Sequence, residues 1–235
     1  MQDFGRAFGE AFALMAALDA DLIEIVILSL QVSLSAVAMA ALIGLPLGAV
    51  LGAWEFRGRG AVVVLVNTMM GLPPVVVGLV VYLLLSNAGP LGVLGLLYSP
   101  AAMVMAQTIL VTPIVAALTR QTIADLKLEY DEQLRVMGVG PWGMVATLLW
   151  DGRYSLITAL LAGFGRAIAE VGAIIIVGGN INHVTRTMTT AIALETSKGD
   201  LGLALGLGII LLSLAVGVNV ALMSLRATAV RAAYA

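Results

Sequence analysis

Five apolar stretches, each long enough to cross a lipid bilayer, constrain this chain more than any other feature of its sequence. The first, from Leu22 to Trp54, holds a single charged residue, Glu24, in about 33 positions. A helix needs only about 20 apolar residues to span the hydrocarbon core, where backbone polar groups must be satisfied internally. With 61% hydrophobic and 11% charged residues, the sequence predicts an all-α, polytopic membrane protein. The expected spans are about 22–54, 61–86, 99–120, 154–178 and 200–225.

The residues before the first span predict a further helix at the membrane surface. Apolar residues recur there at helical spacing, and polar residues occupy the other faces. The apolar positions are Phe4, Phe8, Phe12 and Met15. Residues 1–20 are therefore expected to form an N-terminal amphipathic segment, either lying in the interface or packed on the chain's own spans. The remainder, 21–228, is expected to form one transmembrane domain.

A pair of prolines interrupts the second expected span. Pro73 and Pro74 lie at its centre, where two missing N–H donors leave carbonyl oxygens unpaired. Such backbone is tolerated in a membrane only inside protein or beside a water-filled cavity. We therefore expect the second span to be broken beside a translocation pathway. The alternative is a simple kink.

The fourth expected span contains two charged residues, Arg166 and Glu170. Each would cost about 2.5 to 3.5 kcal/mol at the centre of a membrane helix. Their i, i+4 spacing predicts that they share one helical face and neutralise each other. Two interpretations stay open, a structural ion pair or a charged element of an anion pathway. Asn180, in the glycine-containing segment after this span, is either a further hydrogen-bond donor to an anion or part of an ordinary surface loop.

The positions of the basic residues predict the orientation of the chain. Cytoplasmic segments of membrane proteins retain Lys and Arg. One orientation places eight of them inside, namely Arg57, Arg59, Arg120, Lys127, Arg135, Arg153, Arg226 and Arg231. It leaves three outside, namely Arg6, Arg186 and Lys198. We therefore expect a multi-pass protein of the inner or plasma membrane, with the N-terminus outside and the C-terminus in the cytoplasm.

Several kinds of chemistry are disfavoured by residues that the sequence lacks. There is no cysteine and only one histidine, His183, so neither a thiolate site nor a multi-histidine metal site can form within one chain. The sequence also has no phosphate-binding loop of the type G-x-x-x-x-G-K-[ST] and no H-E-x-x-H motif. We therefore expect no enzyme activity, no metal and no cofactor in this chain. A net charge of −2 gives no reason to expect a nucleic-acid partner.

A charged segment between the third and fourth spans predicts contact with another protein. It lies within an expected cytoplasmic loop, 121–153, and residues 130–151 read YDEQLRVMGVGPWGMVATLLWD. An acidic helix around Glu132 is followed by a glycine break at Gly138 and by a second helix after Pro141. A bent surface element with exposed apolar side chains suits docking into a groove on a partner. The alternative is a single charge on a solvated helix.

This segment resembles the EAA loop of permease subunits in ABC importers, in which an acidic residue is followed six positions later by glycine. Glu132 and Gly138 match these positions, and the likeness continues through Gly140, Pro141 and Trp142. Three other stretches resemble the permeases of tungstate importers, with molybdate permeases more distant. They are NTMMGLPPVVVGLVVYLLLS (67–86), GFGRAIAEVGAIIIVGGNI (163–181) and TTAIALETSKGD (189–200).

The resemblance implies a type I ABC importer permease fold, with about five transmembrane helices, the N-terminal amphipathic helix and a cytoplasmic coupling helix. It also implies a homodimer, two copies of a cytoplasmic ATPase subunit that bind ATP and Mg, and an extracytoplasmic oxyanion-binding protein. The residues implied to contact the ATPase are Glu132, Leu134, Arg135, Gly138, Gly140, Pro141 and Trp142. Those expected at the pathway are Pro73, Pro74, Arg166, Glu170 and Asn180.

The function that the resemblance implies is ATP-driven import of an oxyanion, with tungstate favoured. The alternatives are a permease for molybdate or another small oxyanion, and a gradient-driven anion carrier or channel. The docking segment favours an ATP-driven importer over a carrier or channel, because a carrier or channel needs no element that binds an ATPase. A membrane-embedded enzyme is disfavoured because no catalytic constellation is visible.

Overall fold

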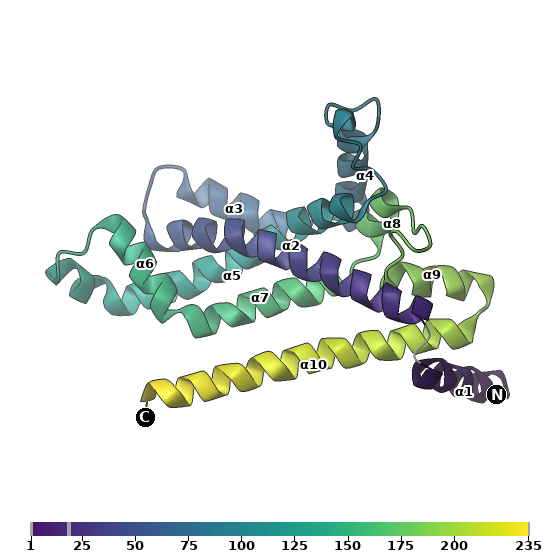
Figure 1. Cartoon of the computed structure of the whole chain (residues 1–235). Helices are drawn as coiled ribbons and strands as arrows, with labels where there is room; N and C mark the ends of the chain where they lie inside the picture. The colour runs from purple at the N-terminus through teal and green to yellow at the C-terminus, as the bar shows by residue number, and fades with distance from the viewer. Residues whose placement is uncertain (1, 18–19, 235) are drawn as a thin grey trace. The chain divides into compact units, whose positions relative to one another are not determined.

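The computed structural model describes residues 2–17 and 20–234, and every regular element in these ranges is helical. This confirms the predicted all-α class (Figure 1). The elements are α1 (Gln2–Ala17), α2 (Ala20–Ala53), α3 (Arg59–Met69), α4 (Pro74–Leu85), the 3-10 turn η1 (Gly92–Leu94), α5 (Pro100–Val136), α6 (Pro141–Asp151), α7 (Arg153–Ile168), α8 (Gly172–Gly178), α9 (Met188–Lys198) and α10 (Leu201–Tyr234).

The described residues contain up to five membrane spans, the number expected from hydropathy. Helices α2, α5 and α10 are each long and apolar enough to cross a bilayer alone. Two further spans result when α3 with α4, and α7 with α8, are each counted as one broken segment. The chain is therefore a multi-pass membrane protein, and each of the two bent helix pairs, α3 with α4 and α7 with α8, is either a broken span or a re-entrant segment.

The second span is broken at its prolines, as predicted. Helix α3 ends at Met69, and α4 begins at Pro74 after Pro73 in an extended conformation, with φ −64° and ψ 122°. Proline is well accepted at the first position of a helix, because its missing N–H would have no partner within the helix there. The break is a full interruption rather than a kink.

The fourth span is also broken, which differs from the continuous helix expected over 154–178. Helix α7 ends at Ile168 and α8 begins at Gly172, so Glu170 lies in the break. The predicted helical i, i+4 geometry of Arg166 and Glu170 is therefore wrong, because the regular helix ends between them. No proline marks this break, and the hydrogen bonds that hold it come from distant parts of the chain.

Helix α5 is longer than the third span that the sequence predicted. Its start agrees with expectation, since the Ser99 hydroxyl accepts a hydrogen bond from the N–H of Ala102 over 3.4 Å and Pro100 is the first helical residue. The helix then passes Pro113 and continues to Val136 without ending near residue 120. The first part of the expected cytoplasmic loop is thus a helical continuation of the span.

The helices pack as two compact units, each built from three separate segments of the chain. Unit 1 contains Met1–Ser35, Pro73–Gln107 and Ala167–Asn219. Unit 2 contains Ala36–Leu72, Thr108–Arg166 and Val220–Ala235. Helices α2, α5 and α10 contribute residues to both units.

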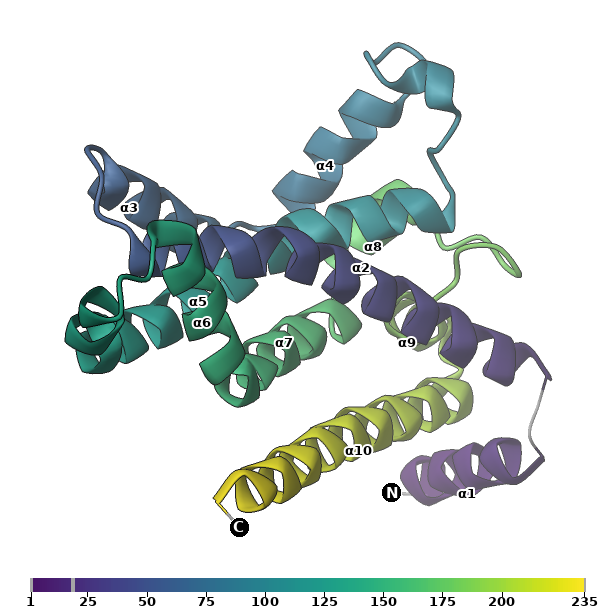
Figure 2. The same ribbon diagram turned by 60° about the vertical axis from the view of Figure 1, so that its left-hand side comes forward.

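In unit 1, the two short helices α4 and α8 pack directly on each other (Figures 1 and 2). A Cβ atom on Gly78 would lie 2.8 Å from the Cα of Ala173, and one on Gly172 would lie 2.9 Å from a methyl group of Val75. Glycine at both positions is thus required by close approach. The contact brings the helix that follows the proline break against the helix that follows the Glu170 break.

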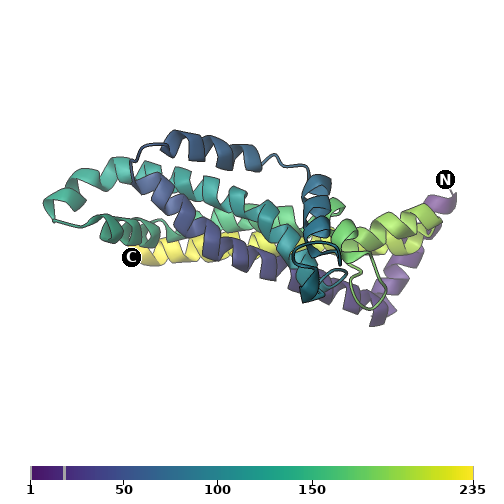
Figure 3. The same cartoon turned by 90° about the horizontal axis from the view of Figure 1, so that it is seen from above.

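In unit 2, the second half of α2 lies against α5 through glycines spaced four residues apart (Figure 3). A Cβ on Gly48 would lie 2.4 Å from the carbonyl oxygen of Ala116, and one on Gly52 would lie 2.8 Å from the carbonyl oxygen of Arg120. Small residues at this spacing let membrane helices approach closely enough for dense packing. Helix α6 packs against this pair of helices.

The two terminal helices agree in part with the sequence. Helix α1 forms where the amphipathic segment was predicted, and Phe12 on it is exposed, whereas the side chains of Phe4 and Met15 lie outside the described part. Helix α10 is capped by Asp200, whose carboxylate accepts a hydrogen bond from the N–H of Leu203 over 3.1 Å. The helix continues to Tyr234, past the expected end of the last span near 225.

Candidate functional site

The segment predicted to dock a partner forms a sharp corner between α5 and α6, which we call the α5–α6 corner (residues 130–151; Figure 2). Gly138 has a φ of 71°, in the left-handed region that glycine adopts without strain. The N–H groups of Gly138 and Val139 donate to the carbonyl oxygens of Arg135 and Leu134, both over 3.0 Å, and so close the end of α5. Pro141 then begins α6.

The inner side of the corner is fixed to the membrane helices of unit 2. Leu134, Met144 and Leu148 are buried in one cluster with Ala49 and Ala53 of α2. This cluster joins the end of α5, the length of α6 and the end of α2 in one hydrophobic core. Leu134, which the resemblance placed among the docking residues, therefore faces inward and stabilises the corner.

A pair of tryptophans completes this attachment. The indole Nε1 of Trp54, just after α2, donates to the carbonyl oxygen of Pro141 over 3.2 Å. The ring of Trp54 meets that of Trp142 edge to face, with centroids 4.6 Å apart. Such ring pairs contribute about 0.5 to 1.5 kcal/mol beyond the burial of their area. The start of α6 is thus attached to the end of α2 as well as to α5.

The outer side of the corner exposes large apolar side chains. Val136 is 89% exposed, and Met137, Trp142 and Trp150 are also largely exposed. A groove of about 610 Å³ opens beside Trp142, with Met144 and charged side chains of α5 in its lining. Exposed apolar surface of this kind is typical of a protein interface.

Glycine at position 140 has no explanation within the chain. Gly140 has φ −69° and ψ 167°, which any residue adopts, and a Cβ atom there would meet nothing within 4 Å. Gly138 differs, because its positive φ requires glycine. No described residue therefore occupies the space beside Gly140, which is available to a partner.

Acidic and basic residues surround the corner on its α5 side. Arg135 pairs with Asp131 over 2.9 Å, and Lys127 pairs with Glu55 over 3.4 Å. Glu132 is exposed and forms no ion pair with any residue whose side chain the structure describes. Its carboxylate is thus available to a group outside the described chain.

Three side chains hold the break around Glu170 in unit 1, namely that of Glu170 itself and two from distant segments of the chain. The Glu170 carboxylate accepts a hydrogen bond from the N–H of Ala173 over 3.1 Å, which caps α8. The Thr189 hydroxyl donates to the carbonyl oxygen of Glu170 over 2.8 Å. The Gln107 amide donates to the carbonyl oxygen of Ala167 over 2.9 Å. These bonds satisfy backbone groups that would otherwise be unpaired in a membrane.

Gln107 and Thr189 were not singled out from the sequence. Both are buried, and Gln107 is only 1% exposed. A glutamine inside an apolar span is a signal that could have drawn attention to Gln107, because an unpaired amide is costly there. No comparable signal marks Thr189, which lies in a polar connection.

The predicted pathway residues are distributed over both units. Pro73, Pro74, Glu170 and Asn180 belong to unit 1, whereas Arg166 belongs to unit 2. Glu170 is 2% exposed, so its carboxylate serves as a helix cap in this conformation. The Asn180 amide donates to the carbonyl oxygen of Thr190 over 3.3 Å, so it holds the loop after α8 against α9.

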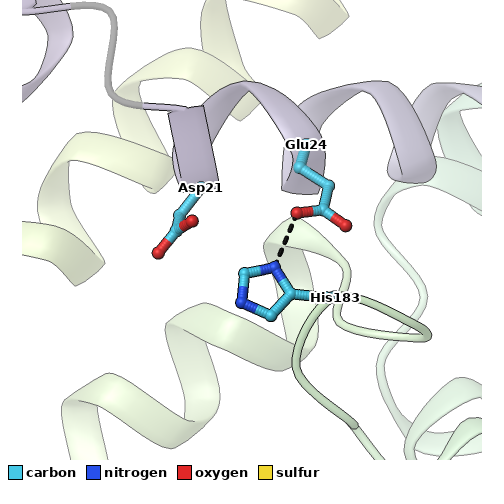
Figure 4. Close-up of side chains that lie close together, drawn as sticks. All are labelled: Asp21, Glu24 and His183. Carbon is cyan, nitrogen blue, oxygen red and sulfur yellow. Dashed lines mark hydrogen bonds and ion pairs between the residues drawn. The ribbon is translucent and has the colours of Figure 1, made fainter.

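That loop is also held from within and against α2. The Thr185 hydroxyl donates to the carbonyl oxygen of Gly178 over 2.5 Å and accepts from the N–H of Ile181 over 2.9 Å. His183 Nδ1 lies 2.8 Å from a carboxylate oxygen of Glu24, which raises the pKa of the imidazole (Figure 4). The loop is thus held by its own hydrogen bonds and by the contact of His183 with α2.

Asp21 completes a small cluster with this ion pair (Figure 4). One ligand atom from each of Asp21, Glu24 and His183 lies within 4.8 Å of the others, and all three residues are exposed. Exposed clusters of this kind are common without a bound ion. We therefore assign Glu24 and His183 as an ion pair that attaches the loop to the first turn of α2.

Comparison with known proteins gives one family and several relatives. Residues 44–228 match the family model described as "binding-protein-dependent transport system inner membrane component". The chain is 42% identical over 203 residues to a "probable anion ABC transporter permease protein" of Haloferax volcanii, which covers 84% of this chain and 88% of that protein.

Two further relatives carry a more specific name. A "tungstate uptake system permease protein TupB" of Peptoclostridium acidaminophilum is 36% identical over 226 residues, which covers 96% of this chain and 99% of that protein. A protein of the same name from Campylobacter jejuni is 37% identical over 175 residues, which covers 74% of this chain and 73% of the relative. The α5–α6 corner and both broken spans lie within the residues matched by the family model.

Proposed function

Because the chain belongs to the family of binding-protein-dependent transport system inner membrane components, we propose that it is the permease subunit of an ATP-driven importer for an oxyanion, with tungstate as its substrate. The choice of tungstate as the substrate rests on the likeness to a tungstate uptake permease, which extends over 96% of this chain and 99% of that relative. A match of this extent leaves little of the membrane domain outside the shared sequence. The chain is thus a transporter subunit, and the energy source is a separate protein.

We infer that the α5–α6 corner receives the ATPase subunit. The exposed apolar side chains supply the contact area, Glu132 supplies an unpaired charge, and the empty space beside Gly140 admits a partner's backbone or side chain. Because the buried face of α6 is attached to α5 and α2, a displacement of α6 would be transmitted to both membrane helices. This is the property that a coupling element needs.

ATP and Mg belong to the partner in this proposal. Closure of two ATPase subunits would draw together the corners of two permease copies, which fits a homodimer around one pathway. An extracytoplasmic binding protein would deliver the oxyanion on the opposite side of the membrane. The excess of basic residues in 57–59, 120–153 and 226–231 supports placing the corner and the C-terminus in the cytoplasm and the N-terminus outside.

The two broken spans are the proposed walls of the pathway. Discontinuous helices in transporters place backbone groups near the substrate at membrane depth. The contact of α4 with α8 brings the two interrupted segments together in unit 1, with Pro74 and Gly172 at their starts. Since Glu170 is buried as a cap, its role in this proposal is to fix the break rather than to bind the anion.

A permease for molybdate or another small tetrahedral oxyanion is the main alternative within the class. Substrate choice would rest chiefly on the binding protein, so this chain needs no tight anion site. A gradient-driven carrier or channel is less well supported, because the α5–α6 corner would then have no use.

The test is ATP-dependent uptake by the assembled transporter. The permease would be purified together with its ATPase and binding-protein partners and reconstituted in vesicles. We expect tungstate to be accumulated only with ATP and binding protein, and more efficiently than molybdate or sulfate. Equal or higher uptake of molybdate would reassign the substrate, and anion flux through the permease alone would overturn the importer class.

A further inference from the structure

Unit 2 contains an apolar groove of about 670 Å³ between α2 and α7. Leu42 and Pro46 of α2 line one side, and Ile157 and Leu160 of α7 line the other. Leu42 is 71% exposed, so the groove is open at the surface. All of its lining residues are apolar except one, Arg153.

Arg153 lies at one end of this groove. It is the first residue of α7, and the groove follows α7 from there to Leu160. On the α2 side, Ala49 and Ala53 pack against α6, so the part of the groove near Pro46 is the part next to Arg153. The groove therefore has a charged end at the α6–α7 junction and an apolar end about 10 Å further along α7.

The guanidinium group of Arg153 is held in place by aromatic neighbours. It lies 4.6 Å from the ring centre of Trp150 and 4.4 Å from that of Tyr154. It donates to the carbonyl oxygen of Trp150 over 2.5 Å and to the hydroxyl of Tyr154 over 3.3 Å. These bonds use two of its five N–H donors, and no carboxylate pairs with it among the residues whose side chains the structure describes.

We propose that this groove binds an anionic phospholipid, with an acyl chain along α2 and α7 and the phosphate group at Arg153. The lining matches both parts of such a molecule, because hydrocarbon suits the apolar walls and a phosphate suits a fixed guanidinium. Tryptophan, tyrosine and arginine together are typical of the membrane interface, where the head groups lie. Basic pockets between membrane helices recognise lipid head groups by this combination.

Other occupants match less of the site. A small free anion would use Arg153 but would leave the apolar walls exposed. A second copy of the chain would cover the walls but would have to bring a carboxylate to neutralise the charge. The lipid inference depends on the membrane location and not on which oxyanion is transported, so it goes beyond the proposed function.

The first experiment uses the full chain in vesicles of phosphatidylcholine mixed with phosphatidylglycerol, with bromine on the acyl chains of one lipid at a time. Brominated chains quench nearby tryptophan, and comparison with a Trp150→Phe variant isolates the signal of Trp150. We expect phosphatidylglycerol to be enriched about fivefold over phosphatidylcholine at Trp150, the effect of one cation near a charged lipid surface. Arg153→Gln should abolish this preference, and Arg153→Lys should retain part of it.

The control is Arg57→Gln, which removes an exposed positive charge from a loop that does not line the groove. It should leave the preference unchanged. Equal quenching by both lipids in the wild-type chain, or an unaltered preference in Arg153→Gln, would overturn the proposal. So would a loss in Arg57→Gln as large as that in Arg153→Gln, because general attraction would then explain the result.

A second experiment tests the groove itself. Ala41→Phe places a ring among the lining residues, and native mass spectrometry counts the phospholipids that remain bound to the purified chain. We expect at least one fewer bound phosphatidylglycerol per chain, with an unchanged oligomeric state and helix content. An unchanged lipid count in a folded Ala41→Phe protein would contradict the proposal. A changed oligomeric state would instead identify the groove as a contact between copies and would also contradict it.

Discussion

The indole nitrogen of Trp54 lies 3.2 Å from the carbonyl oxygen of Pro141 and donates a hydrogen bond to it across 87 positions of sequence. This bond joins the end of a membrane-spanning helix to the first residue of α6. Because the carbonyl belongs to the backbone, the bond fixes the start of α6 whatever side chains α6 presents to a partner. The outer surface of the corner can therefore be specialised for docking while its attachment to α2 stays the same.

Replacing Trp54 with phenylalanine should weaken this attachment without removing the aromatic contact with Trp142. We expect a loss of about 1 kcal/mol of local stability, the usual contribution of one hydrogen bond. In the reconstituted transporter, the number of anions moved per ATP hydrolysed should fall while ATPase binding is retained. Trp54→Phe with a normal transport-to-hydrolysis ratio would show that the bond has no part in coupling.

Gly140→Leu separates folding of the corner from docking. The backbone at Gly140 is acceptable to leucine and nothing lies within 4 Å of the added Cβ, so the isolated permease should fold and insert normally. Copurification of the ATPase subunit should nevertheless fall at least tenfold, because the side chain fills space reserved for the partner. Gly60→Leu is a matched control, since that exposed glycine also has open space around it.

Glu132→Lys tests the charge at the same surface. The carboxylate has no ion-pair partner among the described residues, so reversing its charge should not unfold the corner. We expect weaker association with the ATPase and uncoupled ATP hydrolysis, measured in the same vesicles. Wild-type uptake by Glu132→Lys would assign this residue to a solvated surface, the alternative that the sequence left open.

Gly48→Ala should destabilise the permease through the contact of α2 with α5. The added methyl group would lie 2.4 Å from the backbone oxygen of Ala116, so the helices would have to separate. Overpacking of this kind costs about 1 to 3 kcal/mol. Thermal unfolding in detergent should show a lower midpoint. Gly217→Ala in α10 has open space at its Cβ and should be neutral or slightly stabilising, because alanine favours helix more than glycine.

Hydropathy and proline placement were enough to predict much of this fold. The apolar runs identified the spans because an apolar segment in a membrane must satisfy its own backbone hydrogen bonds, and a helix does so. Pro73-Pro74 predicted the break between α3 and α4, and the Gly138 and Pro141 pattern predicted the corner and α6. In each case, the residues that determine the structure are those within the segment itself.

The break at Glu170 was not predictable in the same way. The segment GRAIAEVGAIII has no proline, and its glycines also suit a continuous membrane helix. The helix ends because Gln107 and Thr189, 60 and 19 residues away from their partners, satisfy carbonyl oxygens at the break. Such long-range hydrogen bonds leave no pattern within the segment itself. The inward position of Leu134 was missed because it depends on a hydrophobic cluster with Ala49 and Ala53, which are distant in the sequence.

Substitutions of Glu170 can separate its hydrogen bond from its charge. Glu170→Gln retains an oxygen that can accept from the N–H of Ala173, so the α8 cap and transport should both be largely preserved. Glu170→Leu leaves that buried N–H without its acceptor, at a cost of about 1 to 3 kcal/mol, and should reduce both stability and uptake. If Glu170→Gln were folded but inactive, the negative charge itself would be required.

The double variant Arg166→Leu/Glu170→Gln extends this test to the other charged residue of the fourth span. Normal oxyanion uptake by a folded double variant would rule out an obligatory charge in the pathway. Loss of uptake with normal unfolding behaviour would instead support a role for Arg166 in anion movement. The experiment requires thermal unfolding and uptake to be measured on the same preparation.

Hydrogen exchange of the loop between α8 and α9 should depend on pH through His183. Its pKa is raised by the hydrogen bond and the charge of Glu24, with a further contribution from Asp21, whereas burial and Arg186 oppose the shift. A raised pKa in the folded state means that the ion pair stabilises the loop fully below the ordinary histidine pKa of about 6.5, and that this stabilisation is lost as the pH rises through the folded value. Protection of the amides in residues 181–186 should therefore fall above about pH 6.5 relative to His183→Gln measured at each pH. At alkaline pH the imidazole is neutral and the ion pair no longer exists, so these amides should be equally protected in the wild-type protein and in His183→Gln. A constant difference between them at all pH values would show that His183 acts through packing, because only a protonated imidazole can respond to the carboxylate of Glu24 in this way.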